Sequence, residues 1–356
     1  MIYKNVQVLR AAAASLVVMA HAVCIMYVPS ALVTLGTSGV DIFFVISGFI
    51  ICQVAGRAQN GAVYFLARRW WRIFPLYWIV LAFSVALTAA FNINWAPWMP
   101  AQHSALDYIL LLTTENHFLP QAWSLVFELY FYALLALVLF IAPAGRFYRT
   151  LALLMGAQVA LVALCGSNGA PPTNALSLEF ALGCAVAWLN ARNWICYELI
   201  AWGVGLLFFG AGEWWSVYIA PLAPLPRLCT FGVGAALGLY ALVGLERRGV
   251  RIFPRVLVRL GDASYSLYLW HIPVLTILMT VGIRKLPALA LVFLAAFASY
   301  YLIEAPLLRL DGPRLLQRLA AKAVVPIRFG WTSLSQRLRE RFSGPSSPVA
   351  WARPET

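Results

Sequence analysis

Two ionisable residues lie on one face of an apolar segment near the start of the chain. Arg10 and His21 flank ten uncharged residues in LRAAAASLVVMAHA, residues 9–22. At about 100° per residue, their spacing of eleven residues makes three helical turns plus about 20°, so the two side chains lie roughly 16 Å apart along one face. Ionisable groups inside a membrane usually face a partner or a cavity. The alternatives are an Arg10 that extends to lipid headgroups and a His21 that only bonds a neighbouring helix.

Two carboxylates are expected at about the depth of His21. Asp41 lies near one end of the apolar segment GVDIFFVISGF, and Glu128 lies just inside the segment WSLVFELYFY. A carboxylate at that depth either pairs with a cation or carries a proton. Three titratable groups at one level predict a catalytic site made of His21, Asp41 and Glu128.

A second cluster is expected at the opposite membrane face. Arg69 and Arg72 are one turn apart in ARRWWRIFPLYW. With Arg10 they predict a cationic mouth that holds phosphates, because a guanidinium pairs well with them. The alternative is ordinary anchoring by basic residues and interfacial tryptophans.

Other polar residues in apolar segments have open roles. His271, in GDASYSLYLWHIPV, suits packing and function equally, and Glu304 is expected to pair with a nearby arginine. Ser47 and Gly48 favour the close approach of two helices.

The composition indicates what elements must position these residues. The chain has 356 residues, of which 62% are hydrophobic and 11% charged, whereas a soluble domain has about a quarter charged residues. Stretches of about 20 apolar residues predict membrane helices. We predict an all-α, polytopic helical bundle of about ten transmembrane helices, near residues 6–27, 36–54, 73–91, 122–142, 149–165, 175–190, 198–212, 226–245, 264–282 and 286–305. Residues 105–113 predict a short interfacial or re-entrant helix.

The placement of charge predicts topology and excludes other classes. The net charge of +13 comes from arginines in alternate loops and in the last fifty residues. This pattern favours cytoplasmic termini and argues against nucleic-acid binding. The six cysteines are scattered without CxxC pairs, so we expect neither a disulfide framework nor a metal site. We expect a membrane domain at 1–308 and a basic, partly disordered tail at 309–356 that contacts anionic lipid.

Taken together, these residues resemble the membrane acyltransferase-three family. The resemblance rests on the Arg10/His21 spacing, FFVISGF at 43–49, Arg69 with Arg72, WSLVFE at 123–128 and SYSLYLWH at 264–271. It covers residues 1–305, and the opening of the chain is most similar to the exopolysaccharide-production branch. Ser47, Trp123, Tyr265 and His271 lie in the matching motifs and are our candidate substrate-binding residues.

The resemblance implies a multi-pass enzyme of the bacterial inner membrane. Such an enzyme moves an acyl group, usually acetyl, from cytoplasmic acyl-CoA to a carbohydrate hydroxyl. It implies acetyl-CoA as the donor, an exopolysaccharide or other surface glycan as the acceptor, and polysaccharide-synthesis machinery as a partner. Arg10, Arg69 and Arg72 would bind the CoA phosphates.

The residues suit this chemistry in two ways. A neutral His21 can take the proton of a hydroxyl as that hydroxyl attacks a thioester, while Asp41 or Glu128 holds the imidazole tautomer. A transient acyl-histidine is the other route. A glycan transporter or flippase and a non-catalytic partner of a polysaccharide synthase remain the competing interpretations, although we find no paired repeats of the kind common in transporters.

Overall fold

The regular elements of the protein are helices. The computed structural model describes residues 3–22, 30–56, 61–93, 95, 103–143, 145–251, 254–283, 285–310, 312 and 314. Within these residues the one non-helical pairing is an isolated bridge between Asn168 and Asn174. The helices are α1 (Lys4–His21), α2 (Ser30–Thr37), α3 (Gly39–Gly56), α4 (Gly61–Phe91), α5 (Ala105–Leu110), α6 (Trp123–Ile141), α7 (Phe147–Cys165), α8 (Leu178–Ala191), α9 (Glu198–Tyr218), α10 (Pro224–Arg227), α11 (Val233–Arg247), α12 (Arg255–Asp262), α13 (Ser264–Thr280), α14 (Lys285–Ser299) and α15 (Ala305–Arg309).

Short irregular helices join several of these elements. Two are 3₁₀ turns, η2 (Pro120–Ala122) and η3 (Ala175–Ser177), and two are π-helical turns, η4 (Leu228–Gly232) and η5 (Tyr300–Glu304). Single π-helical turns change the phase of a helix and are frequent at functional sites. Here η4 follows Arg227 directly and η5 ends at Glu304, and both of these residues form buried ion pairs.

Helix occurs in every one of the ten apolar stretches that the sequence predicts to cross the membrane. In the described part of the chain, six spans are long and apolar enough to cross a bilayer: Ala31–Gly56, Gly61–Phe91, Pro120–Ile141, Phe147–Cys165, Pro224–Arg247 and Lys285–Arg309. The all-helical class and the multi-pass character are therefore confirmed. The predicted helix at 105–113 is shorter than expected, since α5 ends at Leu110 and Leu111 adopts a left-handed conformation.

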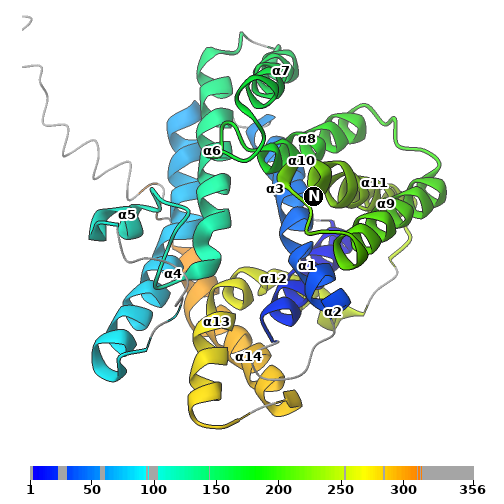
Figure 1. Cartoon of the computed structure of the whole chain (residues 1–356). Coiled ribbons are helices and arrows are strands. Elements are labelled where there is room, and N and C mark those ends of the chain that lie inside the picture. Colours follow the sequence, from blue (N-terminus) through cyan, green and yellow to red (C-terminus); the bar gives the residue numbers. More distant parts are fainter. Residues whose placement is uncertain are drawn as a thin grey trace, which may run out of the picture. The chain divides into compact units, whose positions relative to one another are not determined.

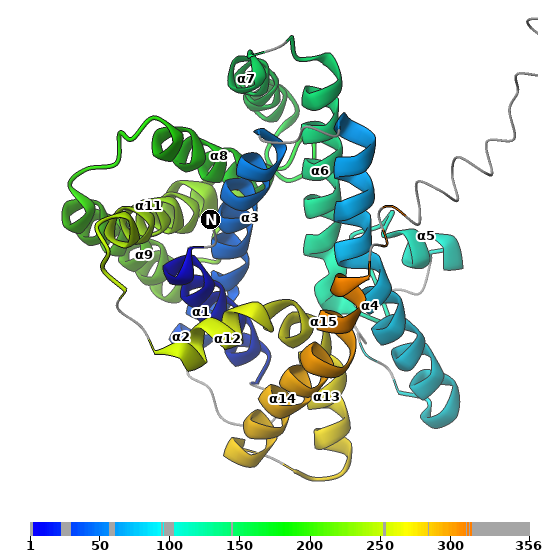
Figure 2. The ribbon, with the colours of Figure 1, turned by 180° about the vertical axis from the view of Figure 1, so that it is seen from behind.

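Helix α3 lies between two groups of helices. Figures 1 and 2 show α8, α9 and α11 on one side of α3, and α4 and α6 on the other. Helix α1 packs against α3, α12 and α13, and α13 packs against α14. As a result α1, α3, α4, α6 and α13 come together around one space.

Helices α3 and α8 cross closely. A Cβ atom on Gly48 would lie 2.1 Å from the Phe180 carbonyl oxygen, and one on Gly183 would lie 2.0 Å from the Val45 carbonyl oxygen. No larger residue fits at either position without separating the helices. The close-packing role predicted for Gly48 is confirmed, and it is the small-residue packing common in membrane bundles.

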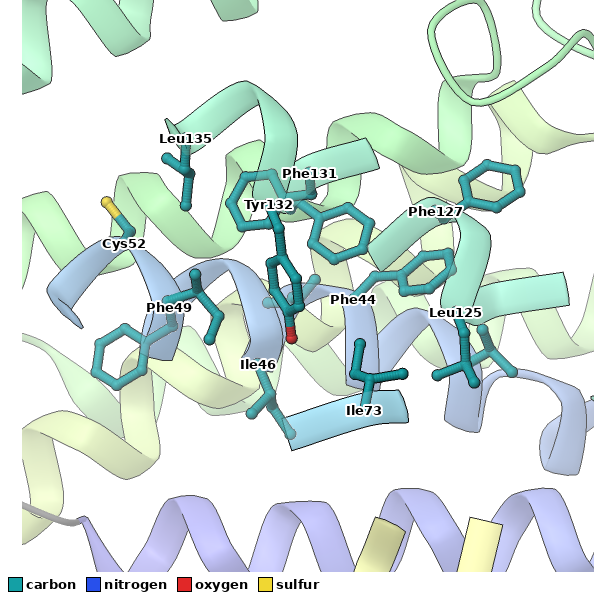
Figure 3. Close-up of a cluster of buried hydrophobic side chains, with 14 of the residues drawn as sticks. Phe44, Ile46, Phe49, Cys52, Ile73, Leu125, Phe127, Phe131, Tyr132 and Leu135 are labelled. Carbon is teal, nitrogen blue, oxygen red and sulfur yellow. The ribbon is translucent and has the colours of Figure 1, made fainter. Parts of the chain in front are cut away.

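Aromatic rings fill the space where α3, α6 and α8 meet. The Phe180 ring stacks on the Phe44 and Phe131 rings, with 4.6 Å between centroids in each pair. Figure 3 shows Tyr132 in this cluster, with its hydroxyl end directed toward Ile46 and Ile73. The packed rings therefore hold the phenol of Tyr132 at the edge of the core.

A carboxylate from far along the chain fixes the start of α1. The oxygens of Glu246, at the end of α11, accept hydrogen bonds from the backbone N–H groups of Lys4 and Asn5, each at 2.8 Å. A negative charge at a helix N-terminus complements unpaired N–H groups and the helix dipole. This contact sets the position of α1, and hence that of Arg10 and His21.

The chain divides into two units, Met1–Gly312 and Pro313–Thr356. All helices given above belong to the first unit. The predicted tail at 309–356 lies outside the described residues from 315 onward.

Candidate active site

A cavity of about 140 Å³ lies among α1, α3, α4, α6 and α13. Its wall is mostly apolar on the α3 side and mostly polar elsewhere. The charged and hydroxyl-bearing residues of the lining are Arg10, Ser47, Arg69, Arg72, Ser124, Glu128, Tyr132, Ser264, Tyr265 and Tyr268. Six of the ten site residues predicted from the sequence are among them: Arg10, Ser47, Arg69, Arg72, Glu128 and Tyr265.

The three predicted arginines meet in this cavity although they come from two helices. Arg10 donates to the Gln7 side chain at 3.0 Å and to the Ser264 hydroxyl at 2.8 Å. The guanidinium of Arg69 lies 5.9 Å from the centre of the Tyr132 ring, and its Nε is buried without a hydrogen-bond partner. Three cations around one space favour an anionic ligand.

Arg72 is held in place by a buried carboxylate. It forms an ion pair with Oε1 of Glu304 and lies 5.1 Å from the centre of the Tyr265 ring. The other oxygen of Glu304 accepts from the Ser266 hydroxyl at 2.6 Å and from the Ser266 backbone N–H at 3.1 Å. The predicted pairing of Glu304 with an arginine is confirmed. Glu304 fixes the Arg72 side chain, which still lines the cavity.

Among the residues that the structure describes, Glu128 is the one carboxylate that lines the cavity. Its Oε1 accepts hydrogen bonds from the hydroxyls of Ser47, at 3.1 Å, and Tyr132. Both donors use the same oxygen, so Oε2 has no side-chain donor among the described residues. Oε2 is therefore the oxygen open to a bound group.

The two histidines lie together just beyond the cavity. The rings of His21 and His271 have centroids 4.9 Å apart, and the His271 ring is 5.9 Å from that of Tyr268, which lines the cavity. His271 is fully buried, and His21 is exposed at the end of α1. The site therefore has two parts, a cationic cavity and a histidine pair, with Tyr268 between them.

Of the two ionisable residues predicted on one face of the first helix, Arg10 lines the cavity and His21 does not. The holder of its tautomer also differs from the prediction. The Nδ1 atom of His21 lies 2.8 Å from the Val17 carbonyl oxygen. A carbonyl only accepts, so in the neutral ring Nδ1 carries the proton and Nε2 has the lone pair. The backbone of α1 fixes the tautomer, where the sequence predicted a carboxylate.

Asp41 is held by a different partner from the one predicted. Its two oxygens accept from Nε and Nη2 of Arg227, at 2.7 and 2.6 Å. Asp41 is fully buried and Glu179 is buried beside the pair. Asp41 therefore does not orient His21. It forms a bidentate ion pair with Arg227 that ties α3 to α10. The sequence signal for it was Arg227 itself, an arginine at the start of the apolar segment predicted at 226–245.

Removal of Arg227 is expected to destabilise the protein strongly. Arg227→Met leaves Asp41 and Glu179 buried without a cation, and loss of one partner of a buried pair costs about 3–5 kcal/mol. The matched control is Arg247→Met, which removes a hydrogen bond between two exposed side chains, Arg247 and Asn193. Substitutions at exposed positions of this kind usually change stability by less than about 0.5 kcal/mol.

Thermal unfolding of the two purified variants measures this difference. Equal unfolding midpoints for Arg227→Met and Arg247→Met would show that the Asp41 pair does not stabilise the fold.

Trp123 lies beside the cavity and not in its lining. Its ring packs against Phe44 and Phe127, with centroids 6.1 and 5.6 Å away. Sequence reasoning passed over Tyr132 and Tyr268. Tyr132 follows Glu128 by one helical turn, a spacing that places both on one face. Tyr268 lies in the SYSLYLWH motif that the sequence analysis had quoted.

The residues that the structure describes contain no group of three or more histidine, cysteine, aspartate or glutamate side chains placed to hold a metal ion. The groups available for chemistry are thus guanidinium, carboxylate, hydroxyl and imidazole side chains.

Comparisons with known proteins identify the family to which the chain belongs. Residues 3–304 match the acyltransferase-three family, described as an acyltransferase domain. The chain is 31% identical over 299 residues to the exopolysaccharide production protein ExoZ of Rhizobium meliloti (strain 1021), covering 78% of this chain and 90% of that protein. No solved structure matches the chain.

Two further relatives carry names of the same class. The putative membrane-bound transacylase BcsY of Komagataeibacter xylinus is 28% identical over 302 residues, covering 76% of this chain and 75% of that protein. The acyltransferase MdmB of Streptomyces mycarofaciens is 27% identical over 327 residues, covering 79% and 83%. The family match extends across most of the chain, and one relative is more than 30% identical. This chain therefore belongs to the membrane acyltransferase-three family.

Proposed function

We propose that the protein transfers an acetyl group from acetyl-CoA to a hydroxyl of an exopolysaccharide or another cell-surface glycan. Family membership makes it a membrane acyltransferase. The acetyl donor and the glycan acceptor are the proposed part. The observation that supports the donor most directly is the convergence of Arg10, Arg69 and Arg72 on one cavity.

The cavity has the chemistry of a site for a phosphorylated donor. The buried, unpartnered Nε of Arg69 and the guanidinium of Arg10 offer N–H donors to phosphate oxygens. The isoleucines of α3 on the opposite wall, Ile46, Ile50 and Ile51, suit the less polar arm of such a donor. Acetyl-CoA would supply an acyl group already activated as a thioester.

The histidine pair supplies the base in this proposal. The Nε2 lone pair of His21 takes the proton of the acceptor hydroxyl, which makes the oxygen a better nucleophile. Glu128 faces the cavity, where its free oxygen positions a polar group of the substrate. We further propose that all ten apolar segments span the bacterial inner membrane with both termini in the cytoplasm. This places Arg10 at the side where acyl-CoA occurs.

The name of one relative supports the choice of acceptor. ExoZ is an exopolysaccharide production protein, and its similarity covers 78% of this chain. We propose a glycan hydroxyl as the acceptor on that basis.

Membranes that contain the protein are expected to transfer radiolabelled acetyl from acetyl-CoA to the exopolysaccharide fraction. The label should be released by mild base, because it is held as an ester. Membranes without the protein are the control. Labelled acetyl-CoA that enters no glycan in the presence of the producing strain's polysaccharide would contradict the proposed function.

A further inference from the structure

Helix α13 gives the order of the groups along the cavity. Its first residue, Ser264, accepts a hydrogen bond from Arg10 at 2.8 Å. One helical turn further along, Tyr268 is the last residue of α13 in the cavity lining. His271 follows by nearly another turn. It is fully buried, and its Nε2 has no hydrogen-bond partner among the described residues. The cavity therefore runs from the arginines at one end to Tyr268 at the end nearest the histidines.

The hydroxyl groups at the Tyr268 end are bonded to one another and to the backbone. The Tyr268 hydroxyl donates to the Gln121 carbonyl oxygen. It has a single proton, so the Ser124 hydroxyl, 2.6 Å away, is the donor in the contact between these two side chains. Tyr268 and Ser124 therefore hold each other in place and have no proton left to donate to a bound group.

The ring of Phe43 closes this end of the cavity from α3. Phe43 lines the cavity, and its ring meets the Tyr268 ring edge-on, with 6.0 Å between centroids. The lining residues nearest to this point along α3 and α6 are apolar: Val40, Phe44 and Leu125. A wall of this kind suits a small apolar group, because a polar group placed against it would lose its hydrogen bonds to water without replacing them.

We propose that Phe43 limits the length of the acyl group that the protein transfers. The inference rests on the proposed function, in which the phosphates of the donor lie beside Arg10 and Arg69. The acyl group of acyl-CoA is at the opposite end of the molecule from its phosphates, so it lies at the end of the cavity that Phe43 closes. The methyl group of an acetyl donor fits against the rings of Phe43 and Tyr268. A longer acyl chain must displace one of these rings, and overfilling a packed site is unfavourable.

Phe43 is the residue of this wall whose change disturbs the fold least. Tyr268 belongs to the hydrogen-bond network with Gln121, and Phe44 is buried in the ring stack where α3, α6 and α8 meet. Phe43 is only partly buried, and its side chain has no polar atom. Replacing it with alanine removes a phenyl ring, which is larger than the two methylene groups that distinguish butyryl from acetyl.

Acyl transfer to exopolysaccharide from acetyl-CoA and butyryl-CoA, assayed in competition, tests this limit. The quantity compared is kcat/KM for butyryl-CoA divided by kcat/KM for acetyl-CoA, which does not depend on the amount of folded protein. One extra methylene in a filled pocket is worth about 10–200-fold, so the wild-type protein should prefer acetyl-CoA by at least about tenfold. Phe43→Ala should raise the ratio by at least about tenfold, because it removes that discrimination. Phe43→Leu should give an intermediate ratio.

Phe49→Leu is the matched control. Phe49 lies on the same helix outside the cavity lining, and its ring packs against that of Tyr3, with 5.8 Å between centroids. This variant should keep the wild-type ratio. A wild-type ratio in the folded Phe43 variants, an equal rise in Phe49→Leu, or a wild-type protein that uses both donors equally well would overturn the role of Phe43.

Phe43→Leu alone decides the outcome if Phe43→Ala does not fold, since leucine keeps an apolar side chain in the wall. Failure of the proposed function gives a different result, in which the wild-type protein transfers neither acyl group.

Discussion

His21→Ala is expected to reduce acetyl transfer by at least about a hundredfold while the protein still inserts and folds. General-base catalysis contributes about 10²–10⁴-fold to a rate, and alanine removes the only nitrogen base of α1 beside the buried His271 ring. His21→Gln keeps a polar side chain without a titrating nitrogen, so it should be nearly as inactive. The measurement is incorporation of labelled acetyl into exopolysaccharide, normalised to the amount of folded protein.

A matched histidine gives the control for this loss. His103 is in the segment before α5 and contacts Glu115 at 3.2 Å, away from the cavity lining. His103→Ala should retain transfer. If His21→Ala protein with an unchanged elution profile transferred acetyl at the wild-type rate, the assignment of His21 as the base would be wrong.

Much of the fold was predictable because membrane helices depend on long apolar runs. A run of about 20 apolar residues has few stable structures in lipid other than a helix. Arg10, Arg69 and Arg72 each lie at the end of an apolar segment, and this position indicated that their side chains would meet at one membrane face. The cavity does bring Arg10, Arg69 and Arg72 together, because positive side chains at one membrane edge share a narrow depth range.

The pairing of the acids was harder to predict, because depth alone does not fix rotation about a helix axis. Asp41 and Glu128 were expected at one level, yet they serve different partners. Asp41 faces Arg227 and Glu128 faces Ser47 and Tyr132. The choice depends on how α3 rotates against α8, which the Gly48 crossing sets. A single sequence, read without an alignment, carries little information on such crossings.

The contact between the histidines was missed for a related reason. His21 and His271 are 250 positions apart, and no spacing in the sequence relates their two segments. Pro273 lies within α13, and Gln121 of η2 bonds the Leu269 carbonyl of that helix. Prolines inside helices are a common cause of kinks, and a kink alters the depth of a side chain without altering the hydropathy of the segment. The unpartnered Nε2 of His271 became visible only with side chains in place.

The second large effect is expected on donor binding. Arg69→Ala should weaken the binding of coenzyme A by about 10- to 100-fold, because a hydrogen bond to a charged group is worth about 1.5–3 kcal/mol and about 1.4 kcal/mol is a tenfold change. Arg69→Lys should recover only part of this affinity, because lysine keeps the charge and loses the planar fork. The probe is coenzyme A itself, titrated into the purified protein.

Arg69 is the better residue for this test than Arg72. Arg72 is paired with Glu304, so its removal leaves a buried carboxylate and mixes a folding defect with a binding defect. Arg69 has no ion pair among the described residues, and its Nε is unpartnered. Arg68 gives the matched control, since it is adjacent, exposed and absent from the cavity lining. Arg68→Ala should bind coenzyme A normally. If Arg68→Ala and Arg69→Ala weakened coenzyme A binding equally, the basic turn would anchor the helix and would not hold the donor. A phosphate bound in the cavity contacts Arg69 and not Arg68, so a true donor site must respond to the two substitutions differently.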